Sequence, residues 1–117
     1  MSKFSAVKHL TKDDIIKNGS VFTPTQLTDI VKEKCVSYIT PNTTLLELGS
    51  GYGAFIYAFK TLGNKIIGTD CDETSVRFLK QEFPKTPVYL ENSLLNVTRS
   101  KYQIDEDEDL FIIGNPP

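Results

Sequence analysis

Hydrophobic residues in the first third of the chain follow a helical pattern. A polar arm over residues 1–20 leads to Thr23, Pro24 and Gln26, which suit a capping box with proline at the first helical position. Apolar residues then recur mostly at three- and four-residue steps over residues 27–39, until a Pro-Asn pair. This pattern predicts a helix with one buried face, made of Leu27, Ile30, Val31, Cys35, Tyr38 and Ile39.

Four short apolar runs follow this helix, and we predict a β-strand at each of them. They alternate with two helical patterns, at 54–61 and at 76–83, which stop at a Gly-Asn pair and at a proline. The fourth run is apolar without interruption, which is typical of a strand covered on both faces. The acidic stretch 105–109 before it is predicted to be a solvated connection. The predicted strands cover residues 44–48, 65–69, 87–91 and 110–113.

Alternating strands and helices predict an α/β fold with a parallel, doubly wound sheet. In such sheets ligands bind beyond the carboxyl ends of the strands, at the crevice where the strand order reverses. Residues 47–53, Asp70, Asn92 and Asn115 all lie at or just after the end of a predicted strand. This convergence predicts a ligand site at that edge of the sheet.

Composition limits the chain to one globular domain. It has 117 residues, of which 39% are hydrophobic and 24% charged, and its net charge of -2 has the wrong sign for a free-standing nucleic-acid binder. Cys35 and Cys71 lack the paired spacing of a zinc site and the density of a disulfide scaffold, so we expect reduced thiols and no metal. Because no signal-peptide pattern or membrane-length apolar run is present, we expect a soluble protein of the cytoplasm.

Three glycines, Gly49, Gly51 and Gly53, stand between a predicted strand and a predicted helix. They let the backbone turn tightly and approach a ligand without obstruction by a Cβ atom. Residues 49–54, with Ala54 at the last position, also satisfy a relaxed dinucleotide-binding fingerprint, with Asp70 near the distance of its ribose-binding acid, and a simple tight turn is a further alternative. Glu47 favours a different cofactor, because a carboxylate there suits the cationic ammonium and sulfonium of S-adenosylmethionine but repels a pyrophosphate.

Asp70 ends the second predicted strand, where a carboxylate can accept two hydrogen bonds from ribose hydroxyls. Asp72 and Glu73 are predicted to serve the start of the following helix, where negative charge is favourable. Cys71 stands where a side chain could pack against the adenine of a cofactor, and an ordinary buried thiol is an equal alternative.

The last residues of the sequence, Asn115-Pro116-Pro117, form a rigid segment rich in carbonyl groups. The side-chain carbonyl of Asn115 and the backbone carbonyl of Pro116 can then accept both protons of one NH2 group. Accepting both protons makes the nitrogen lone pair more available for attack. A loop start after a strand is the alternative interpretation.

Taken together, these motifs resemble the N-terminal part of the gamma-class DNA adenine methyltransferases of restriction-modification systems. The resemblance runs from about Gly19 to Pro117 and depends on the 19–24 lead-in, the glycine turn, Asp70 and the terminal Asn-Pro-Pro. It implies a Rossmann-like S-adenosylmethionine-dependent methyltransferase fold over residues 21–117, cut at the Asn-Pro-Pro motif. It also implies that Thr23 contacts the methionine end of the cofactor. By this resemblance and the residue patterns, the cofactor-binding residues are Phe22, Thr23, Glu47, Gly49, Ser50, Gly51, Gly53, Phe55, Asp70, Cys71, Asn92 and Ser93, and the catalytic residues are Asn115, Pro116 and Pro117.

The chain departs from that family in two places. The aromatic residue that follows Asn-Pro-Pro in the family, and stacks on the flipped adenine, is absent, as are the remaining strands and the target-recognition domain. Where the family often has an acidic residue after the third strand, this chain has Glu91-Asn92-Ser93, in which Asn92 could accept the same hydrogen bond from the adenine amine of the cofactor.

We therefore expect an inactive fragment of an enzyme that methylates the N6 amine of adenine in DNA. Its contacts with DNA would come from a region absent from this chain, and a cognate restriction endonuclease would be a partner. Three alternatives are an N-methyltransferase acting on ribosomal RNA or on a protein glutamine, a dinucleotide-binding oxidoreductase domain, and a non-catalytic binding module.

Overall fold

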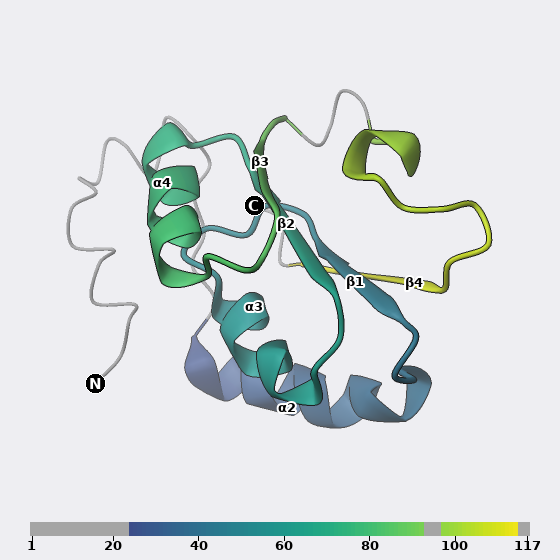
Figure 1. The fold of residues 1–117 in the computed structure, drawn as a ribbon. Helices are drawn as coiled ribbons and strands as arrows, with labels where there is room; N and C mark the ends of the chain where they lie inside the picture. Colours follow the sequence, from purple (N-terminus) through teal and green to yellow (C-terminus); the bar gives the residue numbers. More distant parts are fainter. Residues whose placement is uncertain (1–23, 93–96, 115–117) are drawn as a thin grey trace.

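The computed structural model describes residues 24–92 and 97–114, which form an α/β unit built on one parallel sheet. The strand order is β3-β2-β1-β4 (Figure 1). Leu45 in the central strand pairs with Ile66 on one side and Phe111 on the other. This confirms the predicted parallel sheet and all of its predicted strands to within one residue at either end. The strands are β1 Thr44–Glu47, β2 Ile66–Asp70, β3 Val88–Leu90 and β4 Leu110–Ile113.

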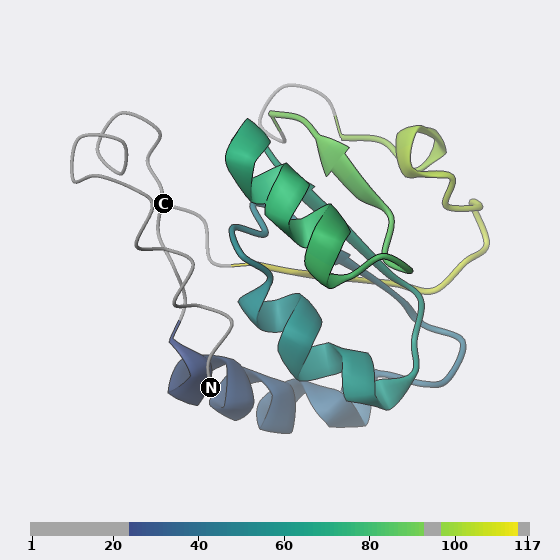
Figure 2. The same ribbon diagram turned by 60° about the vertical axis from the view of Figure 1, so that its left-hand side comes forward.

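Three helices cover one face of the sheet, and a short connection covers the other (Figure 2). The helices are α2 Thr25–Cys35, α3 Ala54–Phe59 and α4 Glu73–Glu82, and single 3-10 turns follow α2 and α3 at Val36–Tyr38 (η2) and Lys60–Leu62 (η3). In the part of the chain that the structure describes, the second face is covered only by the segment around η4, Ser100–Tyr102, and not by a helix as doubly wound sheets require. Even α2, which has 11 residues, is too short to span a bilayer, as is every other described helix.

Adjacent residues of the strands point to opposite faces and so build two cores. Leu45 and Ile66 pack against Ile56 and Phe59 of the helical layer. Leu46 and Ile67 pack on the other side against Tyr102 and its neighbour Ile104. The central strands are therefore covered on both faces, which explains why β1 is buried along its whole length.

The first helix differs from its prediction. It begins at Thr25, so Pro24 is the N-cap and not the first helical residue, and no side chain caps it. Its apolar residues do not form one buried face: Val31, Cys35 and Ile39 pack against the core, whereas the predicted partners on the same face are exposed. Those exposed side chains are Leu27 at 41%, Ile30 at 54% and Tyr38 at 75%.

The fourth strand is not covered on both faces as predicted. It is an edge of the sheet within the described residues, and Ile112 is 54% exposed. The acidic stretch before it is not simply a solvated connection either. Glu108 accepts a hydrogen bond from the hydroxyl of Thr44 at the start of β1, and it lies 3.7 Å from the ammonium of Lys65. The hydrogen bond from Thr44 holds the pKa of the Glu108 carboxyl below its ordinary value, with smaller help from the charges of Lys65 and Arg99.

Gly53 joins the glycine turn to helix α4 through close packing. Its φ of 83° lies in the left-handed region. A Cβ atom at this position would lie 2.7 Å from Phe83 and 2.8 Å from Leu79. Gly63 has a similar φ of 78° at the end of η3, but a Cβ atom there would meet nothing within 4 Å.

We expect Gly53→Ala to destabilise the fold by about 3–5 kcal/mol, because strain in the left-handed region adds to a steric clash. Gly63→Ala is the matched control, since it carries the strain alone and should cost only about 1–2 kcal/mol. Urea unfolding of both variants measures the difference. Equal losses of free energy would show that the close packing of Gly53 on α4 is unimportant.

Candidate functional site

The strand order reverses between β1 and β4. From β1 the chain proceeds outward to β2 and β3, and it then returns to place β4 on the other side of β1 (Figure 1). A crevice at the carboxyl ends of two such strands is where open α/β sheets bind ligands. The residues that follow β1 and β4 are therefore the first candidates for a site.

Close backbone packing joins these two strand ends. The N–H of Leu48 donates to the carbonyl of Ile113 at 3.2 Å. A Cβ atom at Gly114 would lie 2.8 Å from the carbonyl oxygen of Leu48, so only glycine fits there without a shift. The chain that leaves β4 thus passes directly beside the start of the glycine turn. Gly114 leads into the Asn-Pro-Pro segment, which lies outside the described residues.

The glycine turn needs the conformations that the sequence predicts. Gly49 has a φ of 67° and Gly51 a φ of 56°, and residues with a side chain rarely adopt either value. Gly49 is exposed, and a Cβ atom there would meet nothing within 4 Å. The backbone at Gly49 is therefore open to a ligand, whereas Gly53 is buried and serves the packing of α4.

Asp70, at the end of β2, is bound directly to the glycine turn. The N–H of Gly51 donates to Oδ2 of its carboxylate at 2.7 Å, and the N–H of Asp72 donates to Oδ1 at 2.8 Å. Burial raises the pKa of the Asp70 carboxyl, and these two hydrogen bonds oppose that rise. Each oxygen keeps acceptor capacity beyond the bond that it makes, so Asp70 can still accept hydrogen bonds from a ligand.

Ser50 connects the ends of β1 and β2 beneath the surface. Its N–H donates to the carbonyl of Thr69 at 2.6 Å, and its hydroxyl donates to the carbonyl of Glu47 at 3.1 Å while accepting from the N–H of Thr69 at 3.2 Å. A Cβ atom at Gly68 would lie 2.9 Å from this hydroxyl, so glycine makes room for it. Ser50 is 5% exposed, and its side chain therefore holds the turn in place and offers a ligand almost no surface.

Glu47 lies beneath the turn. Its side chain is 3% exposed, and its Oε1 atom has no hydrogen-bond partner among the described residues. Burial raises the pKa of the Glu47 carboxyl well above its ordinary value. Hydrogen bonding with Ser50 and with the backbone of Ile56 lowers it, and the charge of Asp70 raises it further.

The other predicted site residues fall into three groups. Phe55 is 3% exposed and packs in the main core with Phe59, and its contact with a cofactor stays a prediction. Cys71 is exposed beside Asp70, so it is not the ordinary buried thiol of the alternative interpretation. Asn92 is exposed just after β3. Six predicted residues lie outside the described residues: Phe22, Thr23, Ser93, Asn115, Pro116 and Pro117.

Asp72 has the structural role that the sequence predicts. Its carboxylate caps α4 by accepting from the N–H and the hydroxyl of Ser75, at 2.8 and 2.7 Å. Asp70 and Asp72 thus differ in function although only one residue separates them, since the first faces the glycine turn and the second faces the helix.

Glu91 has a role that the sequence did not reveal. Its carboxylate accepts from the hydroxyl of Tyr102 at 2.8 Å and forms an ion pair with Lys101. The ring of Tyr102 also packs edge-on against Tyr89, with 5.2 Å between the ring centres. These contacts fix the end of β3 to the connection on the second face of the sheet. A Lys-Tyr pair about ten residues away gives no periodic signal, so the sequence could not indicate it.

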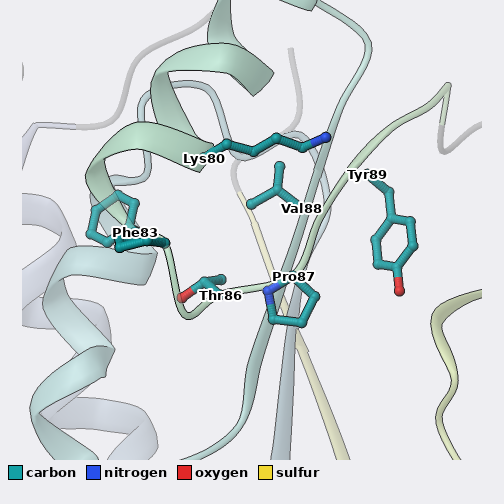
Figure 3. Close-up of a pocket in the computed structure, with 7 residues that line it drawn as sticks. Lys80, Phe83, Thr86, Pro87, Val88 and Tyr89 are labelled. Atoms are coloured by element: carbon teal, nitrogen blue, oxygen red, sulfur yellow. The ribbon is translucent and has the colours of Figure 1, made fainter.

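A hollow of about 460 Å³ lies elsewhere, at the end of α4 and the start of β3 (Figure 3). Lys80, Phe83 and Pro87 are among the residues that line it. Since it adjoins the amino end of β3, it does not include the glycine turn or Asp70. Residues 24–92 and 97–114 contain no cluster of His, Cys, Asp or Glu side chains that could hold a metal ion.

A curated relative of the chain acts on ribosomal RNA, as its name states. The chain is 30% identical over 81 residues to a ribosomal RNA small subunit methyltransferase A of Chlorobium phaeobacteroides, and the match covers 69% of this chain and 29% of the relative. The chain therefore spans less than a third of that relative's length. No protein-family model matches the chain.

Several solved structures with a similar fold are named as methyltransferases. A Pyrococcus horikoshii protein, provisionally assigned as an RNA methyltransferase, matches with a TM-score of 0.65 and 20% identity, over 99% of this chain and 60% of that one. An S-adenosylmethionine-dependent methyltransferase of Clostridium acetobutylicum matches with a TM-score of 0.59 and 17% identity, over 97% and 44%. The fold is therefore that of the Rossmann-like S-adenosylmethionine-dependent methyltransferases, as predicted.

The buried Glu47 should make stability depend on pH. A carboxyl with a raised pKa in the folded protein binds its proton more tightly there than in the unfolded chain, so its contribution to stability is fully present at low pH. This contribution is lost as the pH rises from about 4.3, the ordinary pKa of glutamate, through the raised pKa of the folded protein. We expect the melting temperature of the wild type, relative to that of Glu47→Gln, to fall across this range.

Thermal unfolding of both proteins between pH 4 and pH 8 tests this expectation. The comparison of slopes is independent of any constant cost of placing an amide at residue 47. Parallel curves for the two proteins would mean that the Glu47 carboxyl titrates as an ordinary surface group.

Proposed function

We propose that this chain binds S-adenosylmethionine at the carboxyl ends of β1, β2 and β4, and that it is part of an enzyme that methylates an adenine amine in nucleic acid. The observation that carries the proposal is the 2.7 Å hydrogen bond from the N–H of Gly51 in the glycine turn to the carboxylate of Asp70. It lies beside the point where the strand order reverses. A turn open at Gly49 and a carboxylate with spare acceptors are what a nucleoside with ribose hydroxyls requires.

Each part of the cofactor has a matching group. Asp70 would accept from the ribose hydroxyls, and the exposed backbone at Gly49 lets the ligand approach closely. The unpartnered Oε1 of Glu47 can interact favourably with a positive charge, and the ammonium and sulfonium of S-adenosylmethionine supply such charges. Cys71 is exposed where it could pack on the adenine. When bound, the cofactor supplies a methyl group activated by its attachment to a sulfonium.

The acceptor side of the reaction belongs to the segment after Gly114. The amide oxygen of Asn115 and the carbonyl of Pro116 would accept the two N–H protons of the target amine, which makes its lone pair more available. Asn115 and Pro116 would hold the amine, the bound cofactor would supply its methyl group and leave as the neutral thioether, and the proton that the amine gives up would pass to the solvent. Positioning and carbonyl dipoles therefore carry the chemistry of this chain, without an acid or base side chain.

Two classes of nucleic acid are candidates for the substrate. The lead-in over residues 19–24 favours DNA adenine, since it resembles that of the gamma-class DNA enzymes. The 30% identity to a ribosomal RNA methyltransferase favours RNA adenine as the second candidate. In either case the base must leave its stack to reach the Asn-Pro-Pro segment. A nicotinamide dinucleotide fits less well, because its negatively charged pyrophosphate would need a cation near the glycine turn, and the side chain beneath that turn is the carboxyl of Glu47.

We expect the chain to bind S-adenosylmethionine and S-adenosylhomocysteine in preference to NAD. Asp70→Ala should weaken the binding of either adenosyl ligand by about 1.5–3 kcal/mol, the scale of a charged hydrogen bond. Asp72→Ala is the control: it removes the cap of α4 and so lowers stability by about 1 kcal/mol, with little change in affinity. Calorimetric titration and thermal unfolding separate the two effects.

Tighter binding of NAD than of the adenosyl ligands would overturn the methyltransferase proposal. Equal losses of affinity in the two variants would show instead that Asp70 is not the ribose ligand.

We expect a version of the chain extended beyond Pro117 with the coding sequence of its gene to methylate adenine, and Asn115→Ala to abolish that transfer because one acceptor for the amine is lost. Transfer of tritiated methyl groups to duplex DNA, ribosomal RNA and total protein, assayed in parallel, identifies the substrate. Label in DNA supports the first candidate and label in RNA the second. Label in protein alone, or full activity of Asn115→Ala, would contradict the proposal.

A further inference from the structure

Glu47 is an ionisable residue in a buried position that a charge rarely occupies. Its side chain is 3% exposed, and one of its carboxyl oxygens has no partner among the described residues. Buried carboxylates in folded proteins are normally paired with a cation or fully hydrogen-bonded, because removing the charge from water is costly.

Within residues 24–92 and 97–114, the groups that face Glu47 do not supply a compensating charge. From β2, the carboxylate of Asp70 acts on it with the same sign, and Asp70 is itself beside the acidic cap residue Asp72. From the turn and from α3 come the neutral groups of Ser50 and the Ile56 backbone. From β4, the neighbouring residues are Ile113 and Gly114, which do not ionise. Lys101 and Lys65 form ion pairs elsewhere, with Glu91 and Glu108 respectively.

A buried carboxyl with such neighbours avoids the cost of its charge by keeping its proton. Burial and the charge of Asp70 both raise the pKa of Glu47, in agreement with this arrangement. A bound cation beside the same carboxyl would reverse the balance, since an opposite charge within a few ångströms favours the ionised form.

We propose that Glu47 is protonated in the free protein and gives up its proton to the solvent when the cationic cofactor binds beside it. This inference rests on the proposed function, because the cation is that of S-adenosylmethionine. The unpartnered oxygen then faces the positive charge of the ligand. The protein releases one proton for each cofactor molecule that it binds.

The proton coupling gives the site a means of distinguishing cofactor from product. S-adenosylmethionine carries a sulfonium cation that S-adenosylhomocysteine lacks, so the two ligands differ by one positive charge. Only the charged ligand compensates fully for loss of the Glu47 proton. The preference for S-adenosylmethionine over S-adenosylhomocysteine should therefore increase as the pH rises, until Glu47 is ionised in the free protein as well.

The first test is calorimetric titration of the chain with each ligand, in buffers of different ionisation enthalpy. We expect S-adenosylmethionine to release protons from the wild type at neutral pH and S-adenosylhomocysteine to release fewer. The affinity for S-adenosylmethionine should rise by up to about tenfold per pH unit, as long as Glu47 is still protonated in the free protein. In Glu47→Gln, which cannot lose a proton, both effects should vanish, whereas the control Asp72→Asn should keep them.

A second measurement does not depend on a variant that folds. Isotope-edited infrared or carbon NMR spectra of the wild type, labelled at glutamate carboxyls, should contain one protonated carboxyl that disappears when S-adenosylmethionine is added. Binding without proton release, or release that persists in Glu47→Gln, would overturn the inference and leave the proposed function intact. Failure of both ligands to bind would overturn the proposed function and this inference with it.

Discussion

The architecture of the candidate site depends on the way in which the glycine turn is bound to the end of β2. Three backbone N–H groups make this attachment: that of Ser50 to the carbonyl of Thr69, that of Thr69 to the hydroxyl of Ser50, and that of Gly51 to the carboxylate of Asp70. Gly49 and Gly51 both have positive φ in this turn, a conformation that residues with a side chain rarely adopt. Because the contacts involve buried strand ends, the turn is held by the core and not by solvent-exposed loops.

This attachment determines what lies around it. The turn covers the carboxyl of Glu47 and removes it from water, near the charge of the Asp70 carboxylate. It leaves Gly49 exposed on the other side of the turn. On the side of β4, Gly114 lies close to the carbonyl of Leu48 at the start of the turn. Under the proposed function, cofactor and acceptor would bind at neighbouring strand ends, beside the reversal of strand order, as ligands do in other open α/β sheets.

Features governed by local chemistry could be predicted from the sequence. The strands, the left-handed glycines and the cap at Asp72 each depend on a few consecutive residues. Features that depend on distant contacts could not. The burial of Glu47, the exposure of Ile30 and the bond between Glu91 and Tyr102 follow from how layers meet, which periodicity does not encode. The same limit applies to Phe55, because the family resemblance that suggests a cofactor contact gives no sign that its ring packs in the main core.

The central claim is that a nucleoside ligand binds at the glycine turn and Asp70. Amide NMR spectra of the chain, recorded during titration with S-adenosylhomocysteine, test it most directly because they report on each residue. We expect shifts that centre on Gly49, Gly51 and Asp70 and fade toward the amino ends of the strands. Shifts centred instead on the hollow between Lys80 and Tyr89, or no shifts at saturating ligand, would contradict it.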